Sequence, residues 1–342
     1  MVLYKYLHTS LKPGLYALLC FVFLFFPSLS WGAASGQQDD DFIMHHISDA
    51  HEWHFAAIGQ THLTLPLPVI IFSPDRGLEV FPSSRFLDEH HHHVPYQGYM
   101  LDEHDKIVAI DAARTFYDLS ITKNVASMLI SVVILLVIML AAARRYKHSP
   151  HATPRGFRAF LELMVSFVRD EIAIPNIGEQ NYRRFMPYLL TVFFFIWLNN
   201  LLGLLPGAAN VTGNISVTLV LALFTFVITT ISGTKHYWAH IFNPPGVPKW
   251  LVPIMIPVEL IGLFTKPISL MIRLFANITA GHIILLSIIS LIFVFQTALV
   301  GFISVPFGTF MFLLKLIVAF LQAYIFTLLS AIYFGMAVES HE

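Results

Sequence analysis

The stretch SLMIRLFANITAGH, from Ser269 to His282, decides how this chain is built. It places a permanent positive charge, Arg273, inside a long run of leucine, isoleucine, methionine and phenylalanine residues. A charged side chain at membrane depth costs at least about 2.5 kcal/mol and usually faces a bundle interior, a partner or a water-filled path. The alternative is a side chain that extends to the lipid headgroups. Because apolar residues extend far on both sides of Arg273, the pattern favours a functional intramembrane arginine.

The composition supports a membrane location. Of the 342 residues, 56% are hydrophobic and only 12% are charged, whereas about a quarter of the residues are charged in typical soluble domains. The formal net charge is -1 and no basic patch is present, which argues against nucleic-acid binding. The single cysteine, Cys20, excludes an intrachain disulfide and a cysteine-based zinc site. The sequence therefore predicts an all-α polytopic membrane protein.

The first third of the chain is predicted to be exported. Residues 1–34 carry two lysines, an apolar core and then small residues, the three-part pattern of a secretory signal peptide. A retained first transmembrane helix is the alternative. Residues 35–120 are polar and interrupted by proline and glycine, and ten of the 17 histidines lie between His45 and His104. Two alternating patches, Thr61–Phe72 and Lys106–Ala113, could pair as short strands of a small sheet.

Residues 121–342 form the predicted transmembrane domain. Five apolar runs are long enough to span a bilayer, and they are Asn124–Ala143, Phe185–Leu205, Ile215–Ile231, Leu251–Phe295 and Phe307–Val338. Positive residues after the first and third runs mark the cytoplasmic side, which places the mature N-terminus outside and the C-terminus inside. The run Gly156–Ile172 is typical of an amphipathic helix on the inner surface.

The run Leu251–Phe295 is about twice as long as one perpendicular span requires. It predicts either a strongly tilted helix or one that bends near Pro257 or Pro267. The following segment, Gln296–Pro306, is predicted to be an outer turn before the last span.

Polar residues recur at helical spacing in the last two spans. Within about 40° of Arg273 around the helix axis lie five polar or small residues, namely Glu259, Gly262, Lys266, Ser269 and Asn277. Lys315, Gln322 and Tyr333 share one side of the last span, whereas His282 lies nearly opposite Arg273 on its own helix. Such stripes line water or ion paths, or bind each other.

Arg273 cannot carry a proton, because its guanidinium stays charged. It can, however, favour the ionised form of a carboxylate that passes it. Glu259 lies about four helical turns away, too far for direct contact. The missing carboxylate is therefore expected on another subunit.

Several motifs together resemble one known family. RLFANITAGH, the preceding Glu259–Lys266 pattern, NNLLGLLPG at Asn199–Gly207 and LQAYIFTLLSAIY at Leu321–Tyr333 are similar to subunit a of the F-type ATP synthase. The resemblance covers about residue 124 to the end. It implies a non-catalytic, proton-translocating subunit of a bacterial inner membrane, without a cofactor. Its implied partners are the c-ring, the peripheral-stalk b subunits and the lipid membrane, and its implied ligands are protons that enter and leave through two offset half-channels.

The resemblance also implies roles for particular residues. Asn277 and Gln322 match polar residues beside the arginine, which faces the essential carboxylate of the c-ring and prevents a direct leak. Glu259 matches the acid of the inner half-channel. His282 and Lys315 match titratable positions of the outer one, where many members pair an acid with a histidine. Because this chain has a lysine there, the outer path can instead use Gln322, water or a residue of the exported region.

Two histidine-rich tracts leave a second interpretation of the function open. Asp88–His93 and His45–Phe55 could bind zinc or copper, remain solvated without a metal, or collect protons at the channel mouth. A self-contained metal-ion transporter with a histidine-rich exported sensor is the rival function. The identity of the coupling ion, H⁺ or Na⁺, stays open.

Overall fold

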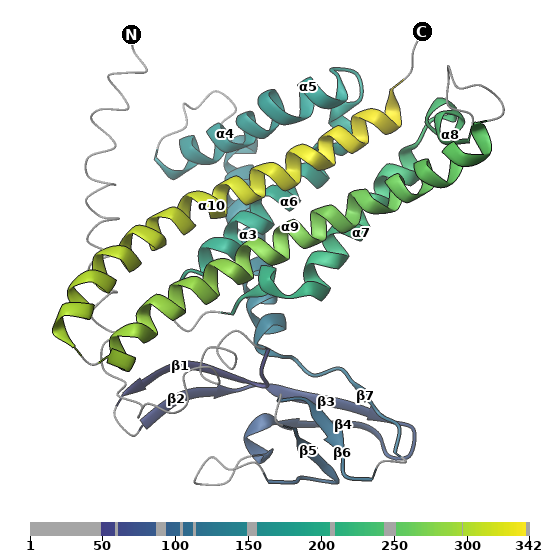
Figure 1. Cartoon of the computed structure of the whole chain (residues 1–342). Coiled ribbons are helices and arrows are strands. Elements are labelled where there is room, and N and C mark those ends of the chain that lie inside the picture. Colours follow the sequence, from purple (N-terminus) through teal and green to yellow (C-terminus); the bar gives the residue numbers. More distant parts are fainter. Residues whose placement is uncertain are drawn as a thin grey trace.

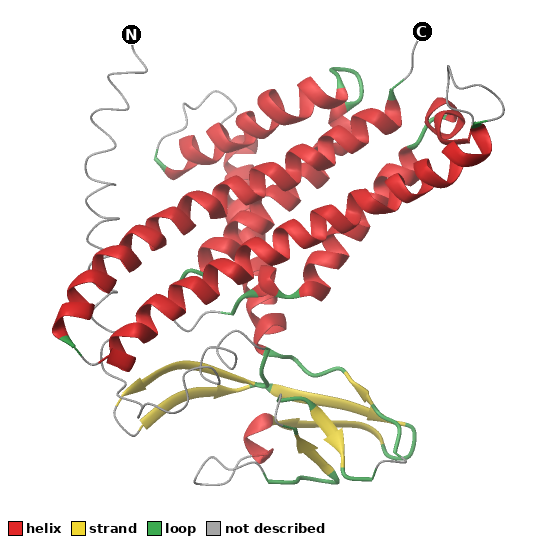
Figure 2. Ribbon diagram, in the orientation of Figure 1, coloured by secondary structure: helices red, strands yellow, loops and turns green. Residues whose placement is uncertain are grey.

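The computed structural model describes residues 49–58, 61–86, 94–102, 105–111, 114–148, 156–205, 209–242, 251–295 and 297–339. Strands occupy one end of the molecule and helices the rest (Figure 2). The predicted signal peptide, residues 1–34, and the histidine run Asp88–His93 lie outside the described residues.

Among the residues that the structure describes, five helices are long and apolar enough to cross a membrane, and this confirms the prediction of an all-α polytopic membrane protein. They are α3 (Lys123–His148), α6 (Tyr182–Leu202), α7 (Ile215–Ser232), α9 (Val252–Phe295) and α10 (Ala298–Val338). Shorter elements connect them, namely α4 (Phe157–Phe167), the π-helical turn η3 (Val168–Ala173), α5 (Ile174–Ile177), the 3-10 turn η4 (Val211–Gly213) and α8 (Lys235–Phe242).

Two long helices, α9 and α10, lie side by side and cross the upright α3 obliquely (Figure 1). α9 is one unbroken helix of 44 residues with Pro257 and Pro267 inside it. Its length of about 66 Å exceeds the roughly 30 Å thickness of a bilayer's hydrocarbon core. Of the two alternatives from the sequence, the structure therefore favours the tilted helix.

The predicted outer turn Gln296–Pro306 is wrong for most of its length. α10 already begins at Ala298 and continues through Pro306. Proline has a φ close to the helical value, and inside a helix it removes only its own amide hydrogen bond and crowds the preceding turn. The 41-residue helix accommodates this single lost hydrogen bond.

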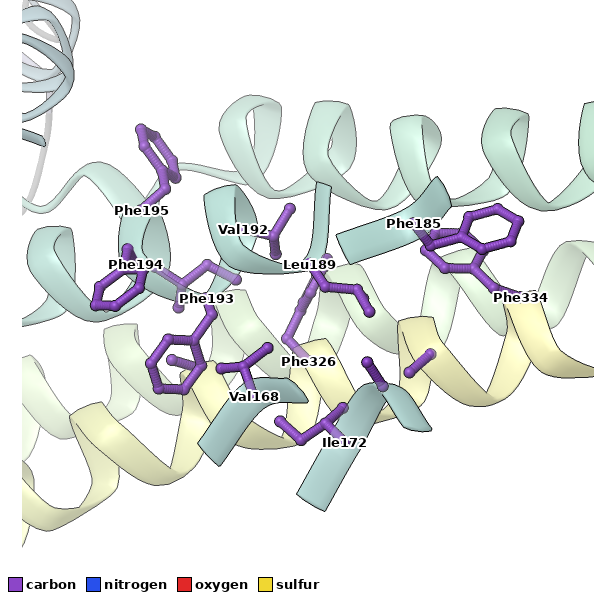
Figure 3. Close-up of a cluster of buried hydrophobic side chains, with 14 of the residues drawn as sticks. Val168, Ile172, Phe185, Leu189, Val192, Phe193, Phe194, Phe195, Phe326 and Phe334 are labelled. Atoms are coloured by element: carbon purple, nitrogen blue, oxygen red, sulfur yellow. The ribbon is translucent and has the colours of Figure 1, made fainter. Parts of the chain in front are cut away.

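The helical core lies between α6, α10 and the η3–α5 segment (Figure 3). Phe193, Leu189 and Ile196 of α6 are fully buried, as are Val168 and Ile172 of η3. The apolar face of the predicted Gly156–Ile172 helix thus packs against protein.

One aromatic contact and one close backbone approach fix the C-terminal part of α10. The rings of Phe185 in α6 and Phe334 in α10 stack with their centroids 4.8 Å apart. Next to Phe334, Gly335 lies so close to α5 that a Cβ there would overlap the main-chain carbonyl oxygen of Asn176. Only glycine fits at this point.

Replacing Gly335 with alanine should therefore push α5 away from α10. Overpacking of this kind costs about 1–3 kcal/mol, and we expect a lower melting temperature of the purified complex. Gly301→Ala is the matched control, because a Cβ at Gly301, on the same helix, meets nothing within 4 Å. The control should keep or slightly raise the melting temperature, since alanine favours helix by about 1 kcal/mol over glycine. Equal melting of both variants would contradict the close contact.

The strand region forms three small antiparallel sheets. β1 (Glu52–Ile58) pairs with β2 (Thr61–Pro66), and β5 (Tyr99–Leu101) pairs with β6 (Ile107–Ala109). β3 (Pro68–Ser73) lies between β4 (Gly77–Pro82) and β7 (Tyr117–Asp118). The two patches expected to pair do contain strands, but they pair with other partners. Thr61–Phe72 holds β2 and most of β3, and Lys106–Ala113 holds β6.

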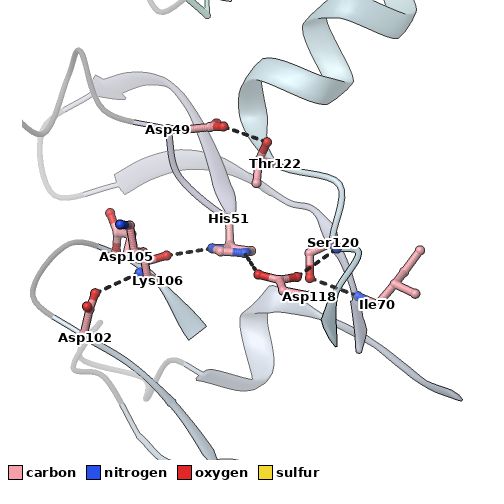
Figure 4. Close-up of polar contacts among 9 residues, drawn as sticks. All are labelled: Asp49, His51, Ile70, Asp102, Asp105, Lys106, Asp118, Ser120 and Thr122. Carbon is pink, nitrogen blue, oxygen red and sulfur yellow. Dashed lines mark hydrogen bonds and ion pairs between the residues drawn. The ribbon is translucent and has the colours of Figure 1, made fainter. Parts of the chain in front are cut away.

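The base of the strand region is tied to the start of α3 by polar contacts (Figure 4). Asp49 accepts hydrogen bonds from the Thr122 hydroxyl at 2.9 Å and from the Asn124 amide at 3.0 Å. The buried imidazole of His51 lies 2.8 Å from the Asp105 carbonyl oxygen through Nδ1 and 3.7 Å from the Asp118 carboxylate through Nε2.

The His51–Asp118 pair should make this attachment dependent on pH. Burial lowers the pKa of His51, but the Asp118 carboxylate and the Asp105 carbonyl raise it more, so that it lies above 6.5. Burial raises the pKa of Asp118, but the bonds from His51 and Ser120 bring it below 3.8. The stabilisation by His51 is full below pH 6.5 and is lost as pH rises through its raised pKa, and that by Asp118 is lost as pH falls through its lowered pKa.

Hydrogen exchange of the link to α3 checks this dependence. The amides of Leu119, Ile121 and Lys123 donate to main-chain carbonyls of the strand region, so their protection reports the attachment. After correction for intrinsic exchange, we expect protection to be highest between the two pKa values. His51→Gln should lower it by the equivalent of about 1–3 kcal/mol and remove the decline at high pH. If the protection of these amides in the wild-type protein did not change above pH 6.5, the His51–Asp118 pair would not stabilise the attachment.

Candidate functional site at the α9–α10 pair

A hydrogen bond between two amide side chains joins α9 and α10 near their middle. Asn277 Nδ2 donates to Gln322 Oε1 at 2.9 Å. Gln322 is only 2% exposed and lies inside the helix pair. Asn277 itself is exposed, and its bond to the buried Gln322 sets the register of the two helices, because sliding them would leave the Gln322 amide without this partner.

Arg273 lies on α9 one turn before Asn277 and is exposed at the surface of the helical bundle. Its neighbour Ile272 is 52% exposed. Within the described part of the chain, no carboxylate forms an ion pair with Arg273. The guanidinium is therefore open to a group that approaches from outside this chain.

The polar residues expected on α10 all face α9. Gln322 bonds to Asn277, and the Lys266 ammonium lies 5.5 Å from the centre of the Tyr333 ring. The side chain of Lys315 lies against Gly281, where an added Cβ would be 3.5 Å from Lys315 Cε.

A cavity of about 190 Å³ opens beside the Asn277–Gln322 bond. It is lined by α9, α10, the end of α6 and η4. Its polar lining consists of Asn199, Asn200, Asn210, Thr212, Asn277, His282 and Lys315. The structure thus brings His282 and Lys315 together with Asn277 around one space. Arg273 is not among the lining residues, in agreement with the expectation that His282 and Arg273 look into different spaces.

Three residues that line this cavity each have a buried polar atom without a hydrogen-bond partner in the described part of the chain. Asn199 Oδ1, Asn210 Nδ2 and Lys315 Nζ are buried and have no hydrogen-bond partner among the described residues. Buried polar atoms in proteins are nearly always paired, often through ordered water. A cavity of this volume has room for several water molecules. Its lining is therefore suited to hydrated transfer of a small ion.

Asn199 and Asn200 of α6 belong to a motif quoted from the sequence, but neither was predicted as a site residue. Asn200 Nδ2 donates to the Ala319 carbonyl at 3.2 Å, and Asn200 Oδ1 accepts from the Thr212 hydroxyl at 2.7 Å. Asn200 thus fixes the end of α6 and η4 against α10. Two adjacent asparagines that end an apolar run were a visible signal, because polar side chains at membrane depth are usually functional.

Glu259 is not brought to the cavity. It lies 14 residues before Arg273 on the unbroken helix, about 21 Å along the axis. The cavity lies on the other side of Arg273, toward the end of the bundle where η4 contacts α3 and the strands begin. Arg273 thus separates two polar regions on opposite halves of α9.

A metal site finds no support in the part of the chain that the structure describes. No group of three or more histidine, cysteine, aspartate or glutamate residues lies close enough there to hold an ion.

Comparisons with known proteins identify the helical part. The sequence model of the family described as ATP synthase A chain matches residues 125–335, and a domain of unknown function, DUF8433, matches residues 42–128. ATP synthase subunit a of Chloroherpeton thalassium is 49% identical over 232 residues, or 66% of this chain and 68% of that protein.

Another relative extends into the strand region. ATP synthase subunit a 2 of Chlorobaculum tepidum is 39% identical over 320 residues, or 91% of this chain and 77% of that protein. The subunit a of Chlorobium phaeobacteroides strain DSM 266 is 46% identical over 74% of this chain and 75% of that protein. These matches cover the helices, the cavity and the arginine-bearing stretch, and the chain belongs to the family of ATP synthase subunit a.

Proposed function

We propose that this chain is the proton-conducting stator subunit of a bacterial ATP synthase and that Arg273 is its electrostatic gate. The observation that carries the proposal is an exposed arginine at the middle of an apolar helix, with a polar cavity on one side of it and Glu259 on the other. An arginine exposed toward lipid alone would be costly. A passing carboxylate of a ring subunit compensates that cost.

The two polar regions act as separate half-channels in this proposal. The cavity with His282 and Lys315 connects the gate to the side of the strand region, and Glu259 belongs to the path on the opposite side. Asn277 and Gln322 hold α9 and α10 together next to the gate. Because Arg273 lies between the regions and remains charged, a proton crosses only on the ring carboxylate, which must lose it near the arginine.

Lys315 has a positional role in the outer path. No acidic side chain lines the cavity in the described part of the chain, and water held by Asn199, Asn210 and Lys315 provides the hydrogen-bonded chain. Protons then move through water and the imidazole of His282.

Orientation follows from the positive residues. Arg144 lies near the end of α3, whose start is bonded to the strand region, and Lys235 begins α8, which lies at the end of the molecule opposite the strands (Figure 1). By the positive-inside rule that end is the cytoplasmic side. Residues 35–120 are then periplasmic, after a signal peptide at residues 1–34, and residues 121–342 form the inner-membrane domain. The partners are the c-ring and the peripheral-stalk b subunits, and this subunit itself carries no catalytic site.

Purification distinguishes this proposal from a self-contained metal-ion transporter. A stator subunit isolated in mild detergent should bring a ring of small subunits with it, and alone in vesicles it should not move a metal ion. A chain that purifies without ring subunits and transports zinc or copper alone would support the rival.

A further inference from the structure

The exposed face of the β3–β4–β7 sheet is unusual in having no charged side chain. Antiparallel pairing places directly opposite residues on one face of a sheet. Phe72 pairs with both Leu78 and Tyr117, and Ile70 pairs with Val80. Together with Leu119, whose amide donates to the Ile70 carbonyl, they form what we call the outer sheet face, consisting of Ile70, Phe72, Leu78, Val80, Tyr117 and Leu119.

No part of the described chain covers the outer sheet face. Leu78 is 63% exposed, Val80 60% and Tyr117 65%. The opposite face holds the buried Val69 and Ile71, which pack against Phe86, Tyr99, Leu101 and Ile107. A sheet with one face in water normally alternates apolar and polar residues. The opposite face also holds the carboxylates of Glu79 and Asp118, which pair with Ile71. The outer sheet face carries no charged side chain, so it is adapted to something other than water.

The outer sheet face lies at the level where the first span begins. The Ile121 amide donates to the Pro68 carbonyl at 3.1 Å, and the Lys123 amide donates to the Ala50 carbonyl at 2.9 Å. The first residue of β3, Pro68, is therefore hydrogen-bonded to Ile121, two residues before α3 begins. The exposed aliphatic side chains of α3 start at Leu129. The apolar surface of the sheet thus continues into the surface that α3 presents to lipid.

We propose that the outer sheet face rests on the lipid bilayer and inserts its apolar side chains at the headgroup boundary. Tyr117 has an apolar ring and a polar hydroxyl, the combination favoured at membrane interfaces. Contiguous exposed apolar surface of this kind marks an interaction site. The bilayer is the occupant because the face is uncharged and is joined to the start of the membrane span by a short bonded link. The inference does not depend on the proton-channel proposal.

Fluorescence quenching in the full chain tests this inference. In the assembled complex, Cys20→Ala removes the single cysteine, and Leu78→Cys allows attachment of an environment-sensitive probe in liposomes. Met100→Cys is the matched control, because Met100 is 41% exposed on β5, on the far side of the sheet. Val80→Cys provides a second position on the outer sheet face if the first variant does not assemble.

We expect lipids with a spin label near the headgroup to quench the probe at position 78 at least twofold, while iodide in the water quenches it weakly. The probe at position 100 should show the reverse. Equal quenching by iodide at both positions would overturn the proposal, because the face would be solvated. Protection from both quenchers at position 78 would also overturn it, since another protein segment, a second copy or a partner subunit would then cover the face.

Discussion

Arg273→Ala should abolish ATP-driven proton pumping in inverted membrane vesicles while the complex still assembles. Without the guanidinium, a ring carboxylate has no charge that compels it to release its proton between the two polar regions. We expect pumping to fall at least a hundredfold, equivalent to about 2.7 kcal/mol or more. After the soluble motor is stripped off, the same vesicles should leak protons passively.

Arg273→Lys is the control that separates charge from packing. A lysine keeps the charge but lacks the planar, five-donor guanidinium, and we expect lower pumping with less leak than for alanine. Assembly is checked by the recovery of ring subunits with this chain. Normal pumping by an assembled Arg273→Ala complex would rule out the gate role.

Filling the cavity should block conduction without causing a leak. Gly281 lines the cavity and lies beside Lys315, so a leucine there occupies space that water needs. We expect Gly281→Leu to reduce proton pumping at least tenfold and to show no passive leak after stripping, because Arg273 is still present. Arg273→Ala should therefore leave a proton path that leaks, whereas Gly281→Leu should leave one that is blocked.

Two controls accompany the cavity variant. Gly281→Ala adds a Cβ at an ordinary 3.5 Å from the flexible Lys315 side chain, and it should pump nearly as wild type. Gly301→Leu adds the same bulk on α10 at a position where a Cβ meets nothing within 4 Å. If Gly281→Leu pumps normally in an assembled complex, the cavity is not the outer path.

The number of spans and their approximate limits could be predicted, because each span is a continuous apolar run in the sequence. The polar stripe on α9 could also be predicted, since a 44-residue helix repeats its faces regularly. The contact between Asn277 and Gln322 required more than periodicity. It depends on the register of two helices, which no single stretch of sequence encodes.

The cavity and the strand pairing could not be read from local patterns. Four elements meet at the cavity, and the part played by Asn210 and Thr212 arises from a connection that the sequence showed only as a loop. In the strand region one signal was overlooked. The segment SPDRG at Ser73–Gly77 turns β3 into β4, and Gly77 has a positive φ of 79°, a conformation that glycine adopts at little cost. Proline, aspartate and glycine in sequence are strong turn markers.

The close fit of Gly335 against Asn176 has a mechanical consequence. In the rotary mechanism that we propose, a ring that turns past α9 pulls this helix sideways, and this subunit must transmit that load to the rest of the complex. α9 passes the force to α10, and α10 cannot slide along α5 without colliding with its backbone. The stacked Phe185–Phe334 pair adds a second brace at the same level. In that proposed mechanism the Gly335–Asn176 contact would bear the load, and we expect a looser contact there to reduce the transmitted torque without causing a proton leak.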